Sequence, residues 1–278
     1  MNDTPPTEET SVEQKRERHG TAADTLSRVN GTLELQAALL ALMLPAGSRR
    51  AARAWAAEGN ESPAMQTVLD HTAHLPGNAR LPWFELLLSR MRGQPLPARQ
   101  ALLEATRRVM QARGSVRPID RLHWLAMRQR LGGNAAVKVK TAASVEISQL
   151  SGDTLQAIAS YSAFLSRMVP SEAAEAGTPS AGAAWYDSVM APWQASENLP
   201  AYLPPDADAL VSAVHELQVL PWMQRPVLVR GWFDAAVAHS LHRRLGDGAA
   251  DALRLSCTLL DSPLPPALAR HFIEAVKP

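Results

Sequence analysis

The sequence predicts an all-α fold, a multi-helix assembly of two similar helical units behind a disordered N-terminal tail. Apolar residues recur every three or four positions through most of the chain, which is the spacing of one helix face. Signals that start and stop helices interrupt this pattern at short intervals, as expected for helices joined by short connections. Only one short stretch alternates between apolar and polar residues, so the sequence offers no set of strands for a sheet.

The composition is that of a globular protein from a reducing compartment. The 278 residues are 46% hydrophobic and carry a formal net charge of +1, so no strong overall field attracts nucleic acid. A single cysteine, Cys257, excludes an internal disulfide. The apolar run at 37–44 is far shorter than the roughly 20 residues of a membrane helix. Because no signal-peptide pattern is present either, we expect a cytoplasmic location.

Residues 1–30 lack apolar periodicity and are expected to form the disordered tail, and residues 31–133 are expected to form the N-terminal helical unit. Its helices should begin where an N-cap or first-turn residue precedes an apolar stripe. These positions are Ser48, Ser62, Pro82 and Pro118. The helices should end at residues that break or turn the chain. These are Pro45, Gly93, Gly114 and Gly132.

Residues 134–205 are expected to connect the two units through helices and linkers. Val137 and Val139 alternate with lysines, but no partner run exists, so we predict a loop there. Asp153 is expected to cap a helix, and Trp185 is expected to lie on a short one. The small and polar residues at 170–182 predict a linker between them.

Residues 206–278 are expected to form the C-terminal helical unit, with helices started by Asp206, Pro226 and Asp247. The tripeptide Leu-Pro-Trp occurs at 81–83 and again at 220–222. In both places we expect it to precede a helix, a glycine-containing corner and a second helix. This echo is the reason for predicting that the two units are similar.

Residues that could carry chemistry do not form a known catalytic pattern. The nearest match to HExxH lies at 215–219 and lacks the second histidine. His239 and His242 are three apart, expected on one side of a helix, and are candidate metal ligands without an evident third partner. The stretch at 246–251 follows a helix rather than a strand and lacks the third glycine of a phosphate-binding loop. We therefore expect no cofactor.

Arginines crowd the first half of the chain, where few acidic residues accompany them. All but four of the 28 basic residues are arginine. Three interpretations stay open: a solvated surface, a face that binds carboxylates of an acidic protein, and a face that binds nucleic acid. The arginines concerned are Arg49, Arg50, Arg53, Arg107, Arg108, Arg113, Arg117, Arg121, Arg128 and Arg130.

Four stretches resemble, in the same order, the cytosolic region that follows the protease domain of some bacterial HtpX-like membrane zinc metallopeptidases. This region is similar in turn to TerB-like helical domains. The stretches lie at 79–114, 153–169, 209–229 and 252–266, and the last, with its sequence LLDSPLPP, is the most specific. The chain has neither the transmembrane helices nor the HExxH helix of those proteins, so it looks like the accessory region alone.

The resemblance also bears on one corner, because TerB-like units tend to carry Ala-Asp-Gly followed by an acidic residue. Here the corner reads Ala112-Arg113-Gly114, with Asp120 in the later acidic position. An arginine in place of an aspartate repels a metal ion. We therefore expect no cation at this corner.

We expect a non-catalytic helical module for protein interaction or regulation, and the resemblance implies a membrane metallopeptidase as its partner. Exposed tryptophan and arginine side chains would carry the binding, because these types dominate interface energetics. Either tryptophan of the echo can instead belong to the core. The candidate binding residues are Trp83, Arg113, Arg117, Asp120 and Trp222.

Two alternatives stay open for the function. One is a zinc-dependent hydrolase, or a remnant of one, with zinc at His239 and His242. The other is an arginine-rich protein that binds nucleic acid. The oligomeric state is not predicted by the sequence.

Overall fold

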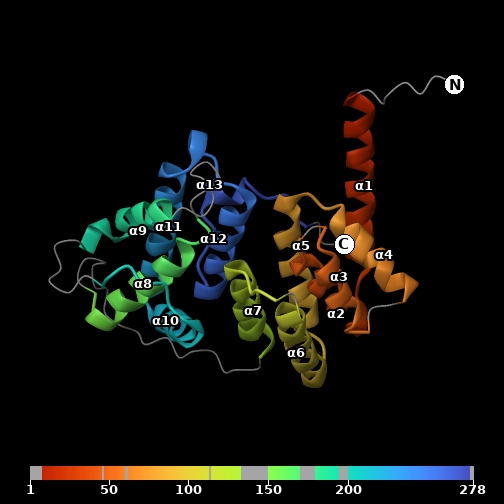
Figure 1. The fold of residues 1–278 in the computed structure, drawn as a ribbon, viewed down its shortest axis with the longest axis horizontal. Helices are drawn as coiled ribbons and strands as arrows, with labels where there is room; N and C mark the ends of the chain where they lie inside the picture. Colours follow the sequence, from red (N-terminus) through yellow and green to blue (C-terminus); the bar gives the residue numbers. More distant parts are fainter. Residues whose placement is uncertain are drawn as a thin grey trace. The chain divides into compact units, whose positions relative to one another are not determined.

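All regular elements in the described part of the chain are helices, so the all-α prediction is confirmed (Figure 1). The computed structural model describes residues 8–45, 47–59, 62–112, 114–132, 150–169, 179–193 and 200–275. The chain divides into two compact units. Unit 1 comprises 1–116, 130–132 and 272–278, and unit 2 comprises 117–129 and 133–271. This division differs from the predicted ranges, because residues 118–129 cluster with unit 2. The similarity of the two units stays a prediction.

Unit 1 is built around one buried helix. Its helices are α1 (Glu8–Arg28), α2 (Thr32–Met43), α3 (Arg49–Ala56), α4 (Pro63–Ala73), α5 (Gly77–Met91) and α6 (Leu96–Ala112). Helix α2 packs against α3, α4, α5 and α6 and is buried on every side from Ala37 to Met43. A helix that is apolar all round requires such a surrounded position. The apolar run at 37–44 is therefore the buried centre of unit 1.

Helix α1 corrects the expectation of a tail that is disordered through residue 30, while residues 1–7 lie outside the described ones. Ala22 and Leu26 lie one turn apart and are buried, and α1 packs against α4. Arg90 of α5 closes the end of α1 by donating from Nη1 to the carbonyl oxygens of Ser27 at 2.8 Å and Val29 at 2.9 Å. Two apolar residues make no visible period in the sequence, and the contacts that order the helix come from elsewhere in the chain.

Pro82 lies inside α5 rather than at its start, which corrects the predicted boundary. A proline within a helix leaves the carbonyl four residues earlier without its usual donor. In this helix that carbonyl belongs to Asn78, and its oxygen accepts a hydrogen bond of 3.1 Å from the backbone N–H of Ile273. The C-terminal segment thus supplies the donor that the proline lacks, and α5 continues through Pro82 to Met91.

The starts and stops predicted from local signals are largely confirmed. Ser48 Oγ accepts from Ala51 N at 3.2 Å, and Ser62 Oγ accepts from Met65 N at 3.4 Å, as N-caps do. Gly114 follows α6 with a φ of +91°, in the left-handed region that glycine adopts without strain. Pro118 begins α7 (Pro118–Leu131).

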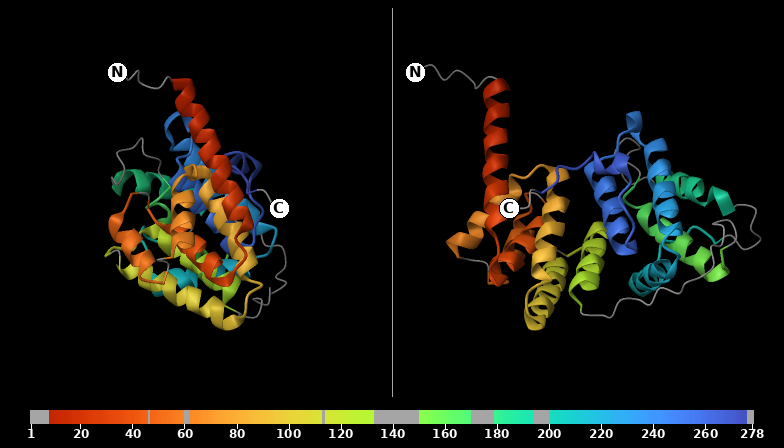
Figure 2. Two further views of the ribbon diagram at one scale, coloured as in Figure 1. Left: turned by 90° about the vertical axis from the view of Figure 1, so that its right-hand side faces the viewer. Right: turned by 180° about the vertical axis from the view of Figure 1, so that it is seen from behind.

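Unit 2 packs its helices, seen from two further sides in Figure 2, around buried aromatic residues that include Tyr161, Phe164 and Trp232. It contains most of α7 together with α8 (Gly152–Leu165), α9 (Pro179–Met190), η2 (Ala191–Trp193), α10 (Ala207–Val219), α11 (Gln224–Ala238), η3 (Leu241–Arg243), α12 (Asp247–Leu260) and α13 (Pro266–Ala269). Helix α8 packs against α9 and α10, and α11 packs against α9 and α12. Tyr161 and Trp232 contact each other with their ring centroids 5.2 Å apart and their planes tilted by 41°.

Two predicted boundaries in unit 2 are corrected, and one is confirmed. Asp153 lies in the first turn of α8, whereas the N-cap is Ser151, whose Oγ accepts from Thr154 N at 3.3 Å. The linker expected at 170–182 ends earlier, because α9 begins at Pro179. Asp206 caps α10 as predicted, with Oδ1 accepting from Ala209 N at 2.8 Å. The loop predicted at Val137 and Val139 lies outside the described residues.

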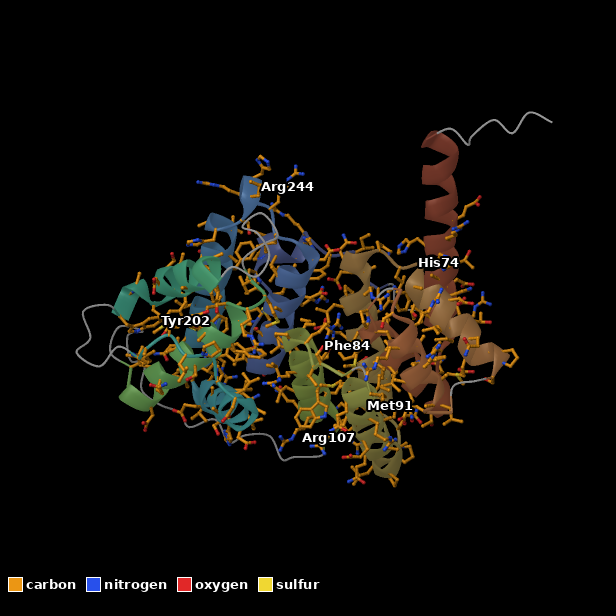
Figure 3. The ribbon with its side chains drawn as sticks, in the orientation of Figure 1. His74, Phe84, Met91, Arg107, Tyr202 and Arg244 are labelled. Carbon is orange, nitrogen blue, oxygen red and sulfur yellow. The ribbon has the colours of Figure 1, made fainter. Side chains whose placement is uncertain are left out.

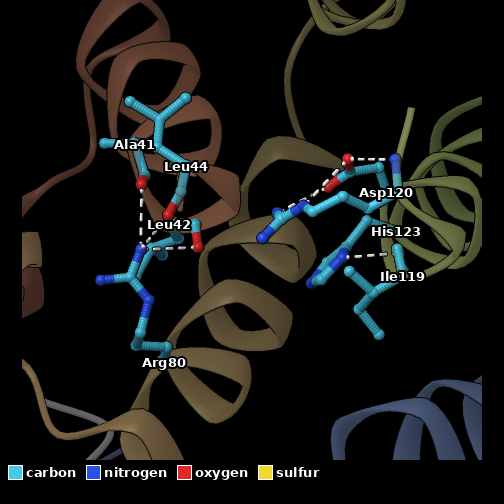
Figure 4. Close-up of polar contacts among 8 residues, drawn as sticks. Ala41, Leu42, Leu44, Arg80, Ile119, Asp120 and His123 are labelled. Atoms are coloured by element: carbon cyan, nitrogen blue, oxygen red, sulfur yellow. Dashed lines mark hydrogen bonds and ion pairs between the residues drawn. The ribbon is translucent and has the colours of Figure 1, made fainter. Parts of the chain in front are cut away.

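Arginine side chains close several helix ends by donating to their last carbonyl oxygens. Arg80 Nη2 reaches Ala41 O, Leu42 O and Leu44 O at 3.1, 2.9 and 3.2 Å, at the end of α2 (Figure 4). A helix end leaves four carbonyls without an intrahelical donor, and the five N–H groups of one guanidinium can satisfy several of them at once. Similar contacts run from Arg50 to Ala112 O, from Arg90 to the end of α1 and from Arg99 to Leu131 O.

Candidate protein-contact surface

Three large apolar side chains are exposed at the connection between α10 and α11 and in the first turn of α11, in unit 2. The exposed fractions are 71% for Trp222, 60% for Met223 and 54% for Val227. Trp222 and Met223 are consecutive, and Val227 lies one helical turn after Met223, so three large apolar side chains are exposed within six residues of the chain. We call these three residues the apolar corner. Single exposed apolar residues are ordinary, whereas a continuous group of large ones is typical of an interaction surface.

A buried arginine holds the backbone of this corner in place. Arg225, only 6% exposed, donates from Nε to Leu220 O at 2.9 Å and from Nη2 to Gln218 O at 2.7 Å, both at the end of α10. Its Nη1 donates to Leu260 O, at the end of α12, at 3.0 Å. The same guanidinium therefore joins the ends of two helices to the start of a third. Trp222 and Met223 are carried by backbone that this contact fixes.

The opposite face of α11 is tied into the core of unit 2. Leu228, Val229 and Trp232 are buried, and Trp232 Nε1 donates to Ser162 Oγ of α8 at 2.9 Å. Tyr161 Oη lies 2.8 Å from Ser256 Oγ of α12. Burial holds the pKa of Tyr161 well above its ordinary value, so this phenol stays neutral. Val227 thus lies on the outer side of a helix whose inner side is packed, and Trp222 and Met223 directly precede this helix.

The two tryptophans of the Leu-Pro-Trp echo have opposite environments. Trp83 lies inside α5 and is 2% exposed, so the core interpretation holds for it and its side chain is not available to a partner. Trp222 lies in the turn before α11 and is exposed, as a contact residue must be. Both tripeptides were expected to precede a helix, which is correct only for residues 220–222.

Arg117 and Asp120 form a local contact at the start of α7 (Figure 4). Asp120 Oδ2 accepts from Arg117 N at 3.0 Å, and Oδ1 accepts from Arg117 Nη2 at 2.7 Å. The carboxylate is fully buried, and its bond to the N–H that precedes the helix is half of a capping box. This contact explains the pair as a means of starting α7. Arg113 lies outside the described residues.

The two candidate metal ligands do not share a helix face, which corrects the sequence-based expectation. Helix α11 ends at Ala238, and His239 Nε2 lies 2.7 Å from Ser188 Oγ of α9. His242 lies in the exposed turn beyond it, with a φ of +51°. Arg244, labelled in Figure 3, follows in the same turn. Among the described residues no three His, Cys, Asp or Glu side chains gather as metal ligands would.

Several of the crowded arginines already have partners within unit 1. Arg108 donates two hydrogen bonds to the Glu58 carboxylate, from Nε to Oε1 at 2.9 Å and from Nη2 to Oε2 at 2.6 Å. Arg107 pairs with Glu104, and Arg50 donates to the end of α6. These arginines therefore help to hold the fold together, a role that none of the three interpretations of the sequence includes.

The described part of the chain contains no helix long and apolar enough to cross a membrane. Compared with protein-family models, with curated proteins and with solved structures, the chain gives no match.

Proposed function

We propose that this protein is a non-catalytic protein-interaction module, and that the apolar corner of Trp222, Met223 and Val227 is its contact surface. The exposed fractions of these three side chains are the observation that carries the proposal. Burying a tryptophan removes roughly 150–250 Å² of surface from water, which makes Trp222 the main anchor. Truncating such an anchor costs a complex about 2 kcal/mol, or about thirtyfold in Kd.

The rigid corner supports this role on energetic grounds. A contact surface that is already ordered loses little conformational entropy when it binds. Arg225 fixes the backbone on both sides of Pro221, and the packed inner face of α11 fixes the position of Val227. The sequence resemblance to the region that follows the protease domain of HtpX-like peptidases adds a membrane metallopeptidase as a partner to be tested.

Site-specific photo-crosslinking in the native cells tests the proposal. A photoreactive phenylalanine derivative replaces Met223, and the matched control replaces Leu33, an apolar residue of unit 1 that is 71% exposed. We expect one discrete heavier adduct from position 223 and none from position 33. Introducing Trp222→Ala beside the probe should remove most of that adduct and leave the thermal midpoint of the protein unchanged.

The proposal is refuted if position 223 gives no adduct, or if positions 223 and 33 give the same adducts. It is also refuted if Trp222→Ala leaves the adduct at full yield. If the expected adduct forms, mass spectrometry of the adduct identifies the partner.

A further inference from the structure

The exposed face of α11 continues beyond the apolar corner as one stripe. After Met223 and Val227 come the exposed residues Arg230, Gly231, Asp234 and Ala238, and the turn that follows exposes Leu241 to 56%. At 3.6 residues per turn the helical members of this stripe fall within an arc of about 100°. Figure 2, right, gives a view in which α11 lies in front of α9. This stripe is wide enough to seat another helix.

The charges on the stripe are one of each sign. Arg230 and Asp234 are exposed and four residues apart, whereas Arg225, the remaining charged residue of α11, is buried. Within the described residues Arg230 and Asp234 make no ion pair and no side-chain hydrogen bond. An arginine placed before an aspartate at this spacing is the less favourable order for a pair within one helix. Both charges therefore remain available to a partner.

Two copies of the stripe that run in opposite directions bring unlike charges together. An antiparallel copy of α11, related by a two-fold axis level with residue 232, brings Arg230 opposite Asp234 and Asp234 opposite Arg230. The same axis brings Val227, near the start of the helix, beside Ala238 at the end of the other copy. A two-fold interface requires this property, because each residue pair then occurs twice with the roles exchanged.

Gly231 lies next to the centre of this arrangement. A Cβ built on it meets no atom within 4 Å, so none of the described residues requires a glycine there. Glycine inside a helix is destabilising relative to alanine, and it permits close approach of another backbone. A second helix that crosses α11 at this level gains from the missing side chain.

We propose that the protein associates with a second copy of itself through an antiparallel α11–α11 contact. This inference rests on the proposed function, because it names the partner of the apolar corner. In the pair, Trp222 and Met223 of one copy meet the turn after α11 of the other. The two Arg230–Asp234 pairs fix the direction and register of the helices, and Gly231 lets them approach closely.

Charge exchange on the full chain tests the pairing, with mass measured by sedimentation equilibrium from micromolar to hundreds of micromolar. The wild type is expected to shift from monomer to dimer. Arg230→Asp alone and Asp234→Arg alone place like charges opposite each other, and each should weaken the dimer by about tenfold. An equimolar mixture of the two variants restores both opposite-charge contacts and should dimerise as the wild type does. The double exchange R230D with D234R should also dimerise.

A second variant separates the contact from folding. Gly231→Gln places a long side chain where the two helices would approach each other, so the dimer should be lost. Glutamine favours the helix more than glycine does, so the thermal midpoint should be unchanged or raised. Gly248→Gln is the matched control, because that glycine of α12 also has open space around it.

A wild type that stays monomeric throughout the range overturns the inference. So does a dimer that tolerates Arg230→Asp and Gly231→Gln, or a mixture of single variants that fails to associate. The proposed function survives these results if position 223 still gives a discrete crosslink to a different protein, and both fail if it gives none.

Discussion

Replacing Arg225 by methionine should destabilise unit 2 more than any change at an exposed arginine. The guanidinium donates to Leu220 O, Gln218 O and Leu260 O at 2.9, 2.7 and 3.0 Å, in a position only 6% exposed. Methionine fills a similar volume but leaves three carbonyls at two helix ends without these donors. A buried polar group that loses its partner costs about 1–3 kcal/mol.

The lower end of that range applies here, because methionine also avoids the desolvation of a buried cation. Three carbonyls at about 1 kcal/mol each give a loss of about 3 kcal/mol in the free energy of unfolding. For a unit of this size that corresponds to a fall of roughly 6–12 °C in Tm.

Urea unfolding followed by circular dichroism measures the loss, and hydrogen exchange of the amides in α10 and α12 assigns it to unit 2. The matched control is Arg270→Met, at an exposed arginine, which should stay within about 0.5 kcal/mol of the wild type. Arg225→Lys should recover less than half of the loss, because one ammonium group cannot reach three carbonyls in this geometry. The reasoning is refuted if Arg225→Met unfolds like Arg270→Met, or if lysine restores full stability.

Further predictions concern a glycine pair and a buried phenol. Gly182→Ala should lower the free energy of unfolding by about 1–3 kcal/mol, because the new Cβ would lie 2.7 Å from Ser166 O. Gly231→Ala should raise the free energy of unfolding by about 0.5–1 kcal/mol, because its Cβ meets no described atom. Equal effects of the two substitutions in urea unfolding would contradict this. The raised pKa of Tyr161 predicts a stability contribution that is complete below the unfolded pKa of about 10 and is lost as pH rises toward the folded one. Tyr161→Phe should therefore flatten the fall in stability above pH 10, and an unchanged alkaline profile would count against this linkage.

The apolar corner could be predicted only in part. Trp222 was a candidate from its residue type and its place after a Leu-Pro break, but Met223 and Val227 were missed. A signal for them existed, because Leu228, Trp232 and Ala236 define the inner face of α11 and both missed residues fall on the other side. The inner stripe predicts the helix, and the apolar residues that lie off this stripe are the ones the folded protein exposes.

Contacts that join distant parts of the chain account for the incorrect boundaries and for the misplaced tryptophan. Pro82 was expected to start a helix, since a proline inside a helix leaves one carbonyl without its donor. Ile273 supplies the donor for Asn78 O in the folded protein, and no local pattern in the sequence reveals this contact. The N-terminal residues were expected to be disordered, since they show no apolar period. Arg90 closes α1 and lies 63 positions after Ser27, so the local sequence gives no sign of this contact. In each case the local pattern was correctly described, and a distant residue changed its outcome.

The sequence by itself determined that the described chain is helical and where many of its helices begin. The caps of Ser48, Ser62 and Asp206 join residues three positions apart, so their physical cause is contained in a few consecutive letters. Only the tertiary structure decided that Trp83 is core and Trp222 is surface, although both follow Leu-Pro. Burial depends on which elements pack across a side chain, and for these two residues those elements come from other parts of the chain.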